Sequence, residues 1–160
     1  MENLRRNNFG FTFVEIFIVI IISGMLIGLS AVSAKEIFYK GNTEKAVFEM
    51  YSNICALRNE SIFTYKQTRV RFYKNYNNTN QSAYVLQVME NNIWKTKERI
   101  VLDKNQKIFS LTFPGSSVNQ NFSYHGTPLY SGSVGLIGNT GEVYYLVFYN
   151  SGRIRIKEIV

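Results

Sequence analysis

The chain has 160 residues, of which 46% are hydrophobic, and its formal net charge is +7. This length accommodates one domain with an anchor rather than two domains. A single cysteine, Cys55, excludes an intramolecular disulfide and a cysteine-rich metal site, and we interpret it as a small apolar core residue of a helix. Residues 61–160 hold twelve Lys/Arg against five Asp/Glu, so the basic character lies in the C-terminal part, where it favours polyanions or acidic partner surfaces.

An apolar run from Phe11 to Val32 dominates the start of the chain. As a helix it would extend about 33 Å, enough to cross a hydrocarbon core of about 30 Å. Arg5 and Arg6 precede it. The positive-inside rule therefore predicts a single span with a cytoplasmic N-terminus, and it places everything after Ala34 outside the membrane.

Glu15 lies inside this apolar run. An ionisable group in a membrane costs roughly 2.5–3.5 kcal/mol on insertion scales, so it persists where a partner neutralises it. A subunit that packs beside copies of itself, each with a positive amine at a matching depth, supplies such a partner. Glu15 therefore predicts polymerisation through the N-terminal helix.

Three interpretations of the N-terminus compete. A secretory signal peptide would be cut after Ala34, at the small residues of Ala31-Val32-Ser33-Ala34. Its apolar core would be unusually long and would contain Glu15. A plain single-span anchor also leaves Glu15 unexplained. The third interpretation is a prepilin-type leader.

The segment Gly10-Phe11-Thr12-Phe13-Val14-Glu15 resembles the processing site of type IV pilins and pseudopilins. The resemblance implies that a prepilin peptidase cuts between Gly10 and Phe11 and methylates the new amine of Phe11. Glu15 of one subunit could then meet the amine of the next. A buried pair of opposite charges can fix register, so we hypothesise that this pair sets the stagger between subunits.

A second, amphipathic part of the helix is expected over residues 34–65. Apolar residues recur there at intervals of three and four: Ile37, Ala46, Val47, Met50, Ile54, Leu57 and Ser61/Ile62. Gly41-Asn42-Thr43 predicts a bend or a soft spot in the helix, with Asn42 or Thr43 able to cap the restart. This part should lie against a sheet.

After Lys66 the hydrophobic period changes to two, which predicts strands. The expected strands are Thr68–Lys74, Ala83–Met89, Ile93–Val101, Gln106–Phe113, Val134–Gly138, Val143–Tyr149 and Arg153–Ile159. The expected fold is α+β, a long N-terminal helix packed on a C-terminal antiparallel β-sheet or β-sandwich. The parts are a leader (1–10), a transmembrane and assembly half (11–33), the amphipathic half (34–65) and an extracytoplasmic β domain (66–160).

Five further stretches resemble, in their order along the chain, the minor pseudopilins of the GspH/FimT type: Leu57–Ile62, Phe122–Gly126, Ser133–Gly138, Val143–Phe148 and the terminal Gly152-Arg153-Ile154-Arg155. The resemblance implies a minor pilin or pseudopilin at the inner membrane that is drawn into a fibre. Its partners would be other subunits, the peptidase, membrane lipid and an inner-membrane assembly platform. Type II secretion, a type IV pilus and DNA uptake stay open as the machine it serves.

The sequence gives little reason to expect an enzyme. The only histidine, His125, lies in a Tyr-His-Gly-Thr-Pro turn with no Cys, Asp or Glu near it in sequence. There is no phosphate-binding glycine loop and no carboxylate pair placed for acid–base work. We therefore expect neither catalysis nor a cofactor.

The last predicted strand alternates basic and apolar residues. Strand geometry places Arg153, Arg155 and Lys157 on one face, and Ile154 and Ile156 on the other. Arg69-Val70-Arg71-Phe72-Tyr73-Lys74 alternates in the same way. One interpretation is a polar face that protects a sheet edge from aggregation. The other is a phosphate-backbone contact, because the GspH/FimT resemblance implies DNA capture in natural transformation by Arg153 and Arg155.

Overall fold

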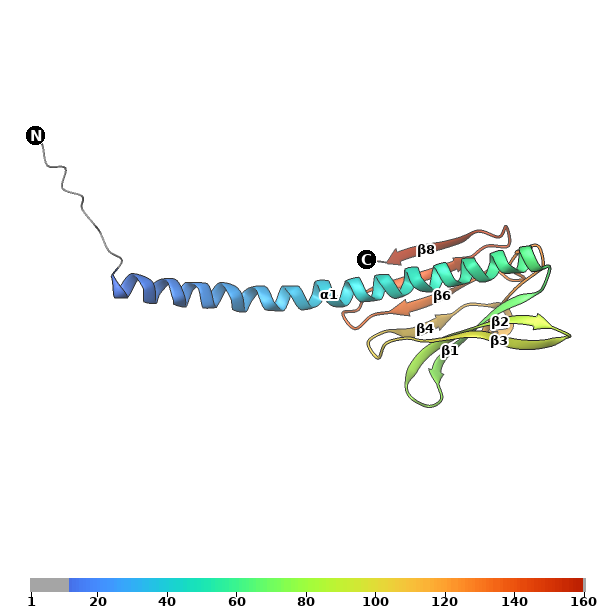
Figure 1. Cartoon of the computed structure of the whole chain (residues 1–160), viewed down its shortest axis with the longest axis horizontal. Helices are drawn as coiled ribbons and strands as arrows, with labels where there is room; N and C mark the ends of the chain where they lie inside the picture. The colour runs from blue at the N-terminus through green and yellow to red at the C-terminus, as the bar shows by residue number, and fades with distance from the viewer. Residues whose placement is uncertain (1–11, 160) are drawn as a thin grey trace, which may run out of the picture. The chain divides into compact units, whose positions relative to one another are not determined.

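The computed structural model describes residues 12–159, and for residues 28–40 and 116 it describes the backbone alone. Two compact units divide the chain, Met1–Ile37 and Phe38–Val160. The first unit contains the start of helix α1, and the second contains the rest of that helix with all the strands (Figure 1).

Helix α1 runs without interruption from Phe13 to Thr64. The predicted bend at Gly41-Asn42-Thr43 is therefore wrong, and tertiary contacts explain why. The Thr43 side chain is buried and donates a hydrogen bond to Glu142 Oε1 at 2.5 Å. The Asn42 carbonyl accepts a hydrogen bond from Gln106 Nε2 at 3.0 Å. Packing against the strands thus overrides the turn preference of these three residues.

Sheet A has the strand order β3-β2-β1-β5, with every neighbouring pair antiparallel. Its strands are β1 (Thr68–Tyr76), β2 (Gln81–Glu90), β3 (Ile93–Val101) and β5 (Asn119–Phe122). Side chains alternate between the core and the opposite face along β1, as the period of two predicts.

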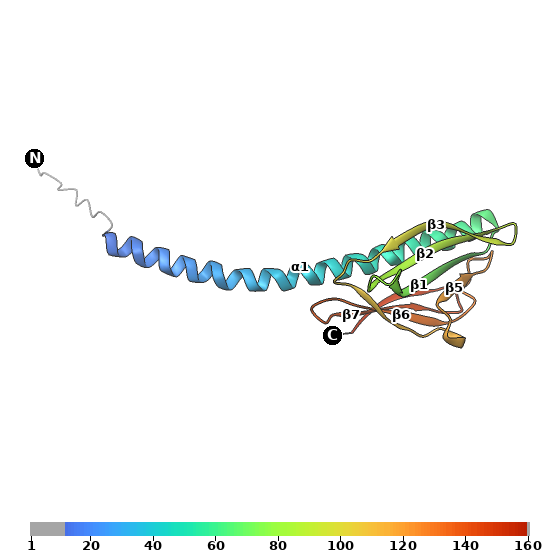
Figure 2. The same cartoon turned by 90° about the horizontal axis from the view of Figure 1, so that it is seen from below.

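Sheet B has the order β4-β6-β7-β8 and is also antiparallel. Its strands are β4 (Lys107–Leu111), β6 (Gly132–Ile137), β7 (Val143–Phe148) and β8 (Ile154–Ile159). A short 3-10 helix, η1 (Pro114–Ser116), lies between β4 and β5. Figure 2, seen from below, shows the part of α1 that belongs to the second unit running along the strands of sheet A.

One hydrophobic core joins the helix to both sheets. Buried residues of α1, spaced by three or four, meet the inward faces of the strands: Val47, Met50, Ile54 and Leu57 from the helix, Val70, Phe72, Tyr84 and Leu86 from sheet A, and Val134, Leu136, Leu146 and Phe148 from sheet B. Asn53 Nδ2 donates to the Tyr84 hydroxyl at 2.9 Å. The expected fold class is thereby confirmed as an N-terminal helix packed on two antiparallel four-stranded sheets.

The strand predictions are confirmed with shifted ends, except for β5, which was missed. Strand β5 reads Asn-Gln-Asn-Phe and lacks the β-branched residues typical of strands. It forms because β1 offers it a free edge, with Arg71 opposite Asn119 and Thr68 opposite Phe122.

Where the structure describes side chains, it contains no helical stretch that is both long and apolar enough to cross a membrane. Phe11 and residues 28–33 of the predicted span lie outside the residues so described.

Candidate functional site

The described start of α1 forms a capping box between Thr12 and Glu15. The Glu15 carboxylate accepts hydrogen bonds from the Thr12 N–H at 3.0 Å and from the Thr12 hydroxyl at 3.1 Å. In return, the Glu15 N–H donates to the Thr12 hydroxyl at 3.3 Å. The side chain of each residue thus accepts a hydrogen bond from the backbone N–H of the other, as in other capping boxes. Glu15 therefore has a local role that the sequence did not reveal. The predicted processing residues Gly10 and Phe11 lie outside the described residues.

Side chains 12–27 are all exposed, although most of them are apolar. Phe13 retains 83% of its accessible surface and Ile27 retains 71%. A helix that is apolar all round is normally covered, either by lipid or by other helices. This surface is therefore a candidate interface along the first unit.

At the C-terminal end of α1, Arg58 joins stretches that are far apart in sequence. Its Nε donates to the carbonyl of Gly126 at 2.8 Å. A Cβ built on Gly126 would lie 2.7 Å from the Ile62 side chain, and one built on Gly152 would lie 3.2 Å from Arg58 Nη2. Both glycines also have positive φ, 73° and 84°. Three of the five stretches that resemble the GspH/FimT type therefore meet at one point.

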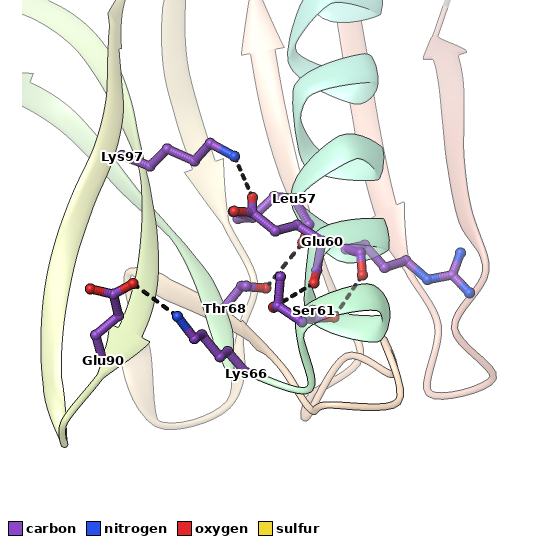
Figure 3. A network of polar contacts seen from close by, with 9 residues as sticks. Leu57, Glu60, Ser61, Lys66, Thr68, Glu90 and Lys97 are labelled. Atoms are coloured by element: carbon purple, nitrogen blue, oxygen red, sulfur yellow. Dashed lines mark hydrogen bonds and ion pairs between the residues drawn. The ribbon is translucent and has the colours of Figure 1, made fainter.

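Further polar contacts fix the same end of the helix to sheet A (Figure 3). Thr68 Oγ1, at the start of β1, donates to the Leu57 carbonyl, and Ser61 Oγ donates to the Arg58 carbonyl. Lys97 on β3 forms an ion pair with Glu60 at 2.5 Å. The Ser61 hydrogen bond lies within α1, so Thr68 alone contributes a hydroxyl contact between the helix and sheet A. Exposed ion pairs contribute little stability, so this buried contact of Thr68 carries most of the connection.

Glu90, at the end of β2, bridges Lys95 and Lys66 at 2.8 Å and 2.9 Å. Hydrogen bonds from Lys95 and then Lys66 lower the pKa of Glu90 to about 2. The bridge connects the start of β3 to the residues that follow α1, again at the same end of the second unit.

The histidine and the cysteine do not meet other metal-binding side chains. His125 is exposed, and its ring centroid lies 4.3 Å from that of Tyr124. Cys55 is half-buried and packs against the core rather than within it, so its interpretation as a core residue of a helix is only partly met. Within the described part of the chain, no group of three His, Cys, Asp or Glu side chains could hold a metal ion.

The basic strand has the two faces that its sequence predicted. Arg153, Arg155 and Lys157 are exposed, whereas Ile154 is buried and Ile156 packs against the core. Strand β8 lies at the edge of sheet B and pairs with β7 alone. This position is compatible with both interpretations, because an edge strand needs protection and its cations can also reach a polyanion.

Sequence reasoning did not find the contacts of Arg58. An arginine beside Leu57, on the buried stripe of an amphipathic helix, was the available signal, since such a charge needs a partner. The positions of Arg69 over the Trp94 ring and of Arg71 over the Tyr73 ring were also missed. Those arginines alternate with core residues along β1, which could have indicated a second functional face.

Comparison with models of known protein families, with curated proteins and with solved structures gives no match for this chain.

Proposed function

We propose that this chain is a minor pilin or pseudopilin of the GspH/FimT type, which joins a fibre through its N-terminal helix. The observation that carries the proposal is Glu15, set in register behind Gly10 and Phe11 on a helix whose described side chains 12–27 are exposed and largely apolar. The contacts among Arg58, Gly126 and Gly152 support the same family, because they explain structurally why three of the five resembling stretches have their sequence.

In this proposal the chain starts in the inner membrane, with residues after 34 outside it. A prepilin peptidase cuts between Gly10 and Phe11, and an assembly platform then draws the subunit into a fibre. Lipid covers the apolar surface of residues 12–27 before assembly, and neighbouring helices cover it afterwards. The protein acts by assembly rather than by catalysis.

Glu15→Gln and Glu15→Ala together test the role of the carboxylate. A glutamine can replace glutamate in a capping box, so Glu15→Gln preserves the contacts with Thr12 and removes only the charge. If the charge pairs with the amine of Phe11 in a neighbouring subunit, both variants fail to enter fibres, as counted by shearing and immunoblotting. Normal incorporation of Glu15→Gln, with loss of Glu15→Ala, would mean that capping is the whole role.

A DNA-binding minor pilin for natural transformation is the second candidate. It is favoured by three exposed cations, Arg155 and Lys157 on β8 and Arg153 directly before it. Such binding would be independent of DNA sequence and would fall steeply with salt. Full-length protein in non-ionic detergent, titrated with duplex DNA over a salt series, tests it. Arg153→Ala/Arg155→Ala should lower the log–log salt slope by about 2 if both side chains contact phosphates.

A further inference from the structure

Sheet A has a polar face on the side opposite the core. Val70, Phe72, Tyr84 and Leu86 point into the core, so their neighbours along β1 and β2 point the other way. Strand register arranges these neighbours in two rows across all four strands. The rows are Asn121, Arg69, Gln87 and Thr96, and then Asn119, Arg71, Val85 and Arg99.

Each arginine of this face lies over an aromatic ring. The guanidinium carbon of Arg69 is 4.2 Å from the ring centroid of Trp94. Arg71 is 5.2 Å from the Tyr73 ring, and Arg99 is 5.4 Å from the Tyr76 ring. Such distances permit cation–π attraction. The face therefore presents flat cationic and aromatic planes rather than extended, solvated charges.

The charge of this face is uncompensated. The two rows contain three arginines and no carboxylate, and none of the ion pairs in the described part of the chain involves Arg69, Arg71 or Arg99. Partial burial, followed by the charge of Arg71, lowers the pKa of Arg69. An anion placed between these arginines would offset the repulsion between their charges.

Polar atoms on the same rows lack hydrogen-bond partners. They are buried in the described structure, and they are Arg71 Nε, Asn119 Oδ1 and Asn121 Oδ1. A buried donor or acceptor without a partner is destabilising, so native proteins rarely retain several together without a reason. Here they adjoin Arg69 and Arg71, although Arg69 Nε itself donates to Gln87 Oε1 at 2.7 Å. Outward rotation of these side chains would let a ligand with both donors and acceptors satisfy the buried atoms.

We propose that this face of sheet A binds single-stranded nucleic acid. Phosphates would pair with the arginines, bases would stack on the aromatic and guanidinium planes, and base edges would reach the asparagine side chains. A duplex fits less well, because its bases are already stacked and paired. The site lies on a different sheet from Arg153 and Arg155, and it does not rest on the proposed assembly function.

Trp94 makes the proposal directly measurable, because it is the only tryptophan of the chain. Full-length protein in non-ionic detergent is titrated with a 12-nucleotide oligothymidine while tryptophan fluorescence is recorded. We expect saturable quenching, with a log–log salt slope of about −2 for three phosphate contacts on a single strand. An oligonucleotide that binds, as followed by its own labelled anisotropy, and leaves Trp94 unchanged would overturn the site.

Two matched variants locate the binding. Arg69→Gln/Arg71→Gln should weaken oligothymidine binding by at least about tenfold, since charge and stacking are both lost. Arg153→Gln/Arg155→Gln, with the same change of charge on β8, should leave it within about twofold. The reverse result would overturn the proposal, and circular dichroism establishes that both variants are folded. The wild-type quenching tests the site without any substitution.

Heparin and a duplex of matched length separate nucleic acid from other polyanions. Heparin carries dense negative charge without bases, so it should bind more weakly and should quench Trp94 less at equal saturation. Equal affinity and equal quenching by heparin would identify a general polyanion surface instead. Tighter, quenching binding of the duplex would equally refute the preference for single strands.

Discussion

Arg58 connects the C-terminal end of α1 to two loops of the second unit. Its hydrogen bond to Gly126 spans 68 residues of sequence, and Gly152 lies beside its guanidinium. Arg58→Met keeps most of the aliphatic stem but leaves the Gly126 carbonyl without this donor. We expect the free energy of unfolding to fall by about 1–3 kcal/mol, as for other hydrogen bonds from charged groups. Urea unfolding followed by circular dichroism measures the change.

Arg153→Met is the control for this substitution. Arg153 is exposed on the edge of sheet B, so its loss should alter stability by no more than about 0.5 kcal/mol. Equal effects of the two variants would show that Arg58 acts only through the net charge of the protein, and the structural role would then be wrong.

Individual contacts of this kind could not be predicted from the sequence. The resembling stretches around Leu57, Gly126 and Gly152 were visible as separate patterns, but nothing in their local spacing brings them together. For Glu15, the local contact was the one that the prediction missed. Its charge was interpreted through a distant partner, whereas the structure gives it a neighbour three residues away, Thr12.

At the scale of elements, the continuity of α1 through Gly41 is the feature that the sequence predicted wrongly. Gly41 is exposed, and a Cβ added there would meet nothing within 4 Å. Alanine is favoured over glycine inside a helix, so Gly41→Ala should raise the free energy of unfolding by about 0.5–1 kcal/mol. Urea unfolding again provides the measurement.

Gly132→Ala is the contrasting variant. A Cβ at Gly132 would lie 2.7 Å from the Thr112 carbonyl oxygen, so this variant should lose stability. If Gly41→Ala also lost stability, the segment around Gly41 would not be the regular helix described, and the bend expected from its sequence would be restored.

Strands were predicted better than turns or edges. Alternation of apolar and polar residues located β3 with its observed ends, Ile93–Val101, and located β7 to within one residue. Strand β5 was not predicted because its sequence, Asn-Gln-Asn-Phe, does not alternate between apolar and polar residues. Its existence depends on pairing with β1, which is a property of the assembled sheet rather than of the segment.

At the scale of the whole molecule, the candidate surfaces lie on different elements. The apolar start of α1 serves the proposed assembly, β8 presents its cations at the edge of sheet B, and the arginine rows lie on sheet A. Substitutions on one surface should therefore leave the side chains of the other two surfaces, and their binding, unchanged. Because the surfaces are separate, fibre assembly and nucleic-acid binding can be tested independently, with different substitutions.

Acid stability is a property of the whole second unit, because two of its carboxylates have lowered pKa values. Burial alone would raise the pKa of Glu142, but hydrogen bonds from Thr140 and Thr43 outweigh it and lower that pKa below its ordinary value of 4.5. Through Thr43, Glu142 attaches α1 to the residues between β6 and β7. For Glu90, the lysine contacts lower the pKa from 4.5 to about 2.

A carboxylate whose pKa is lower in the folded state stabilises the fold above its ordinary pKa, and this contribution disappears as the pH falls through the folded pKa. Stability should therefore decline as the pH falls below 4.5 toward the lowered pKa of each group, which for Glu90 is about 2. Glu142→Gln removes one of the two titrations, so its stability should fall less between pH 7 and pH 3, measured by urea unfolding at each pH. Glu44→Gln, at an exposed position of α1, should follow the wild type. A wild-type pH dependence in Glu142→Gln would mean that the contact with Thr43 does not stabilise the fold.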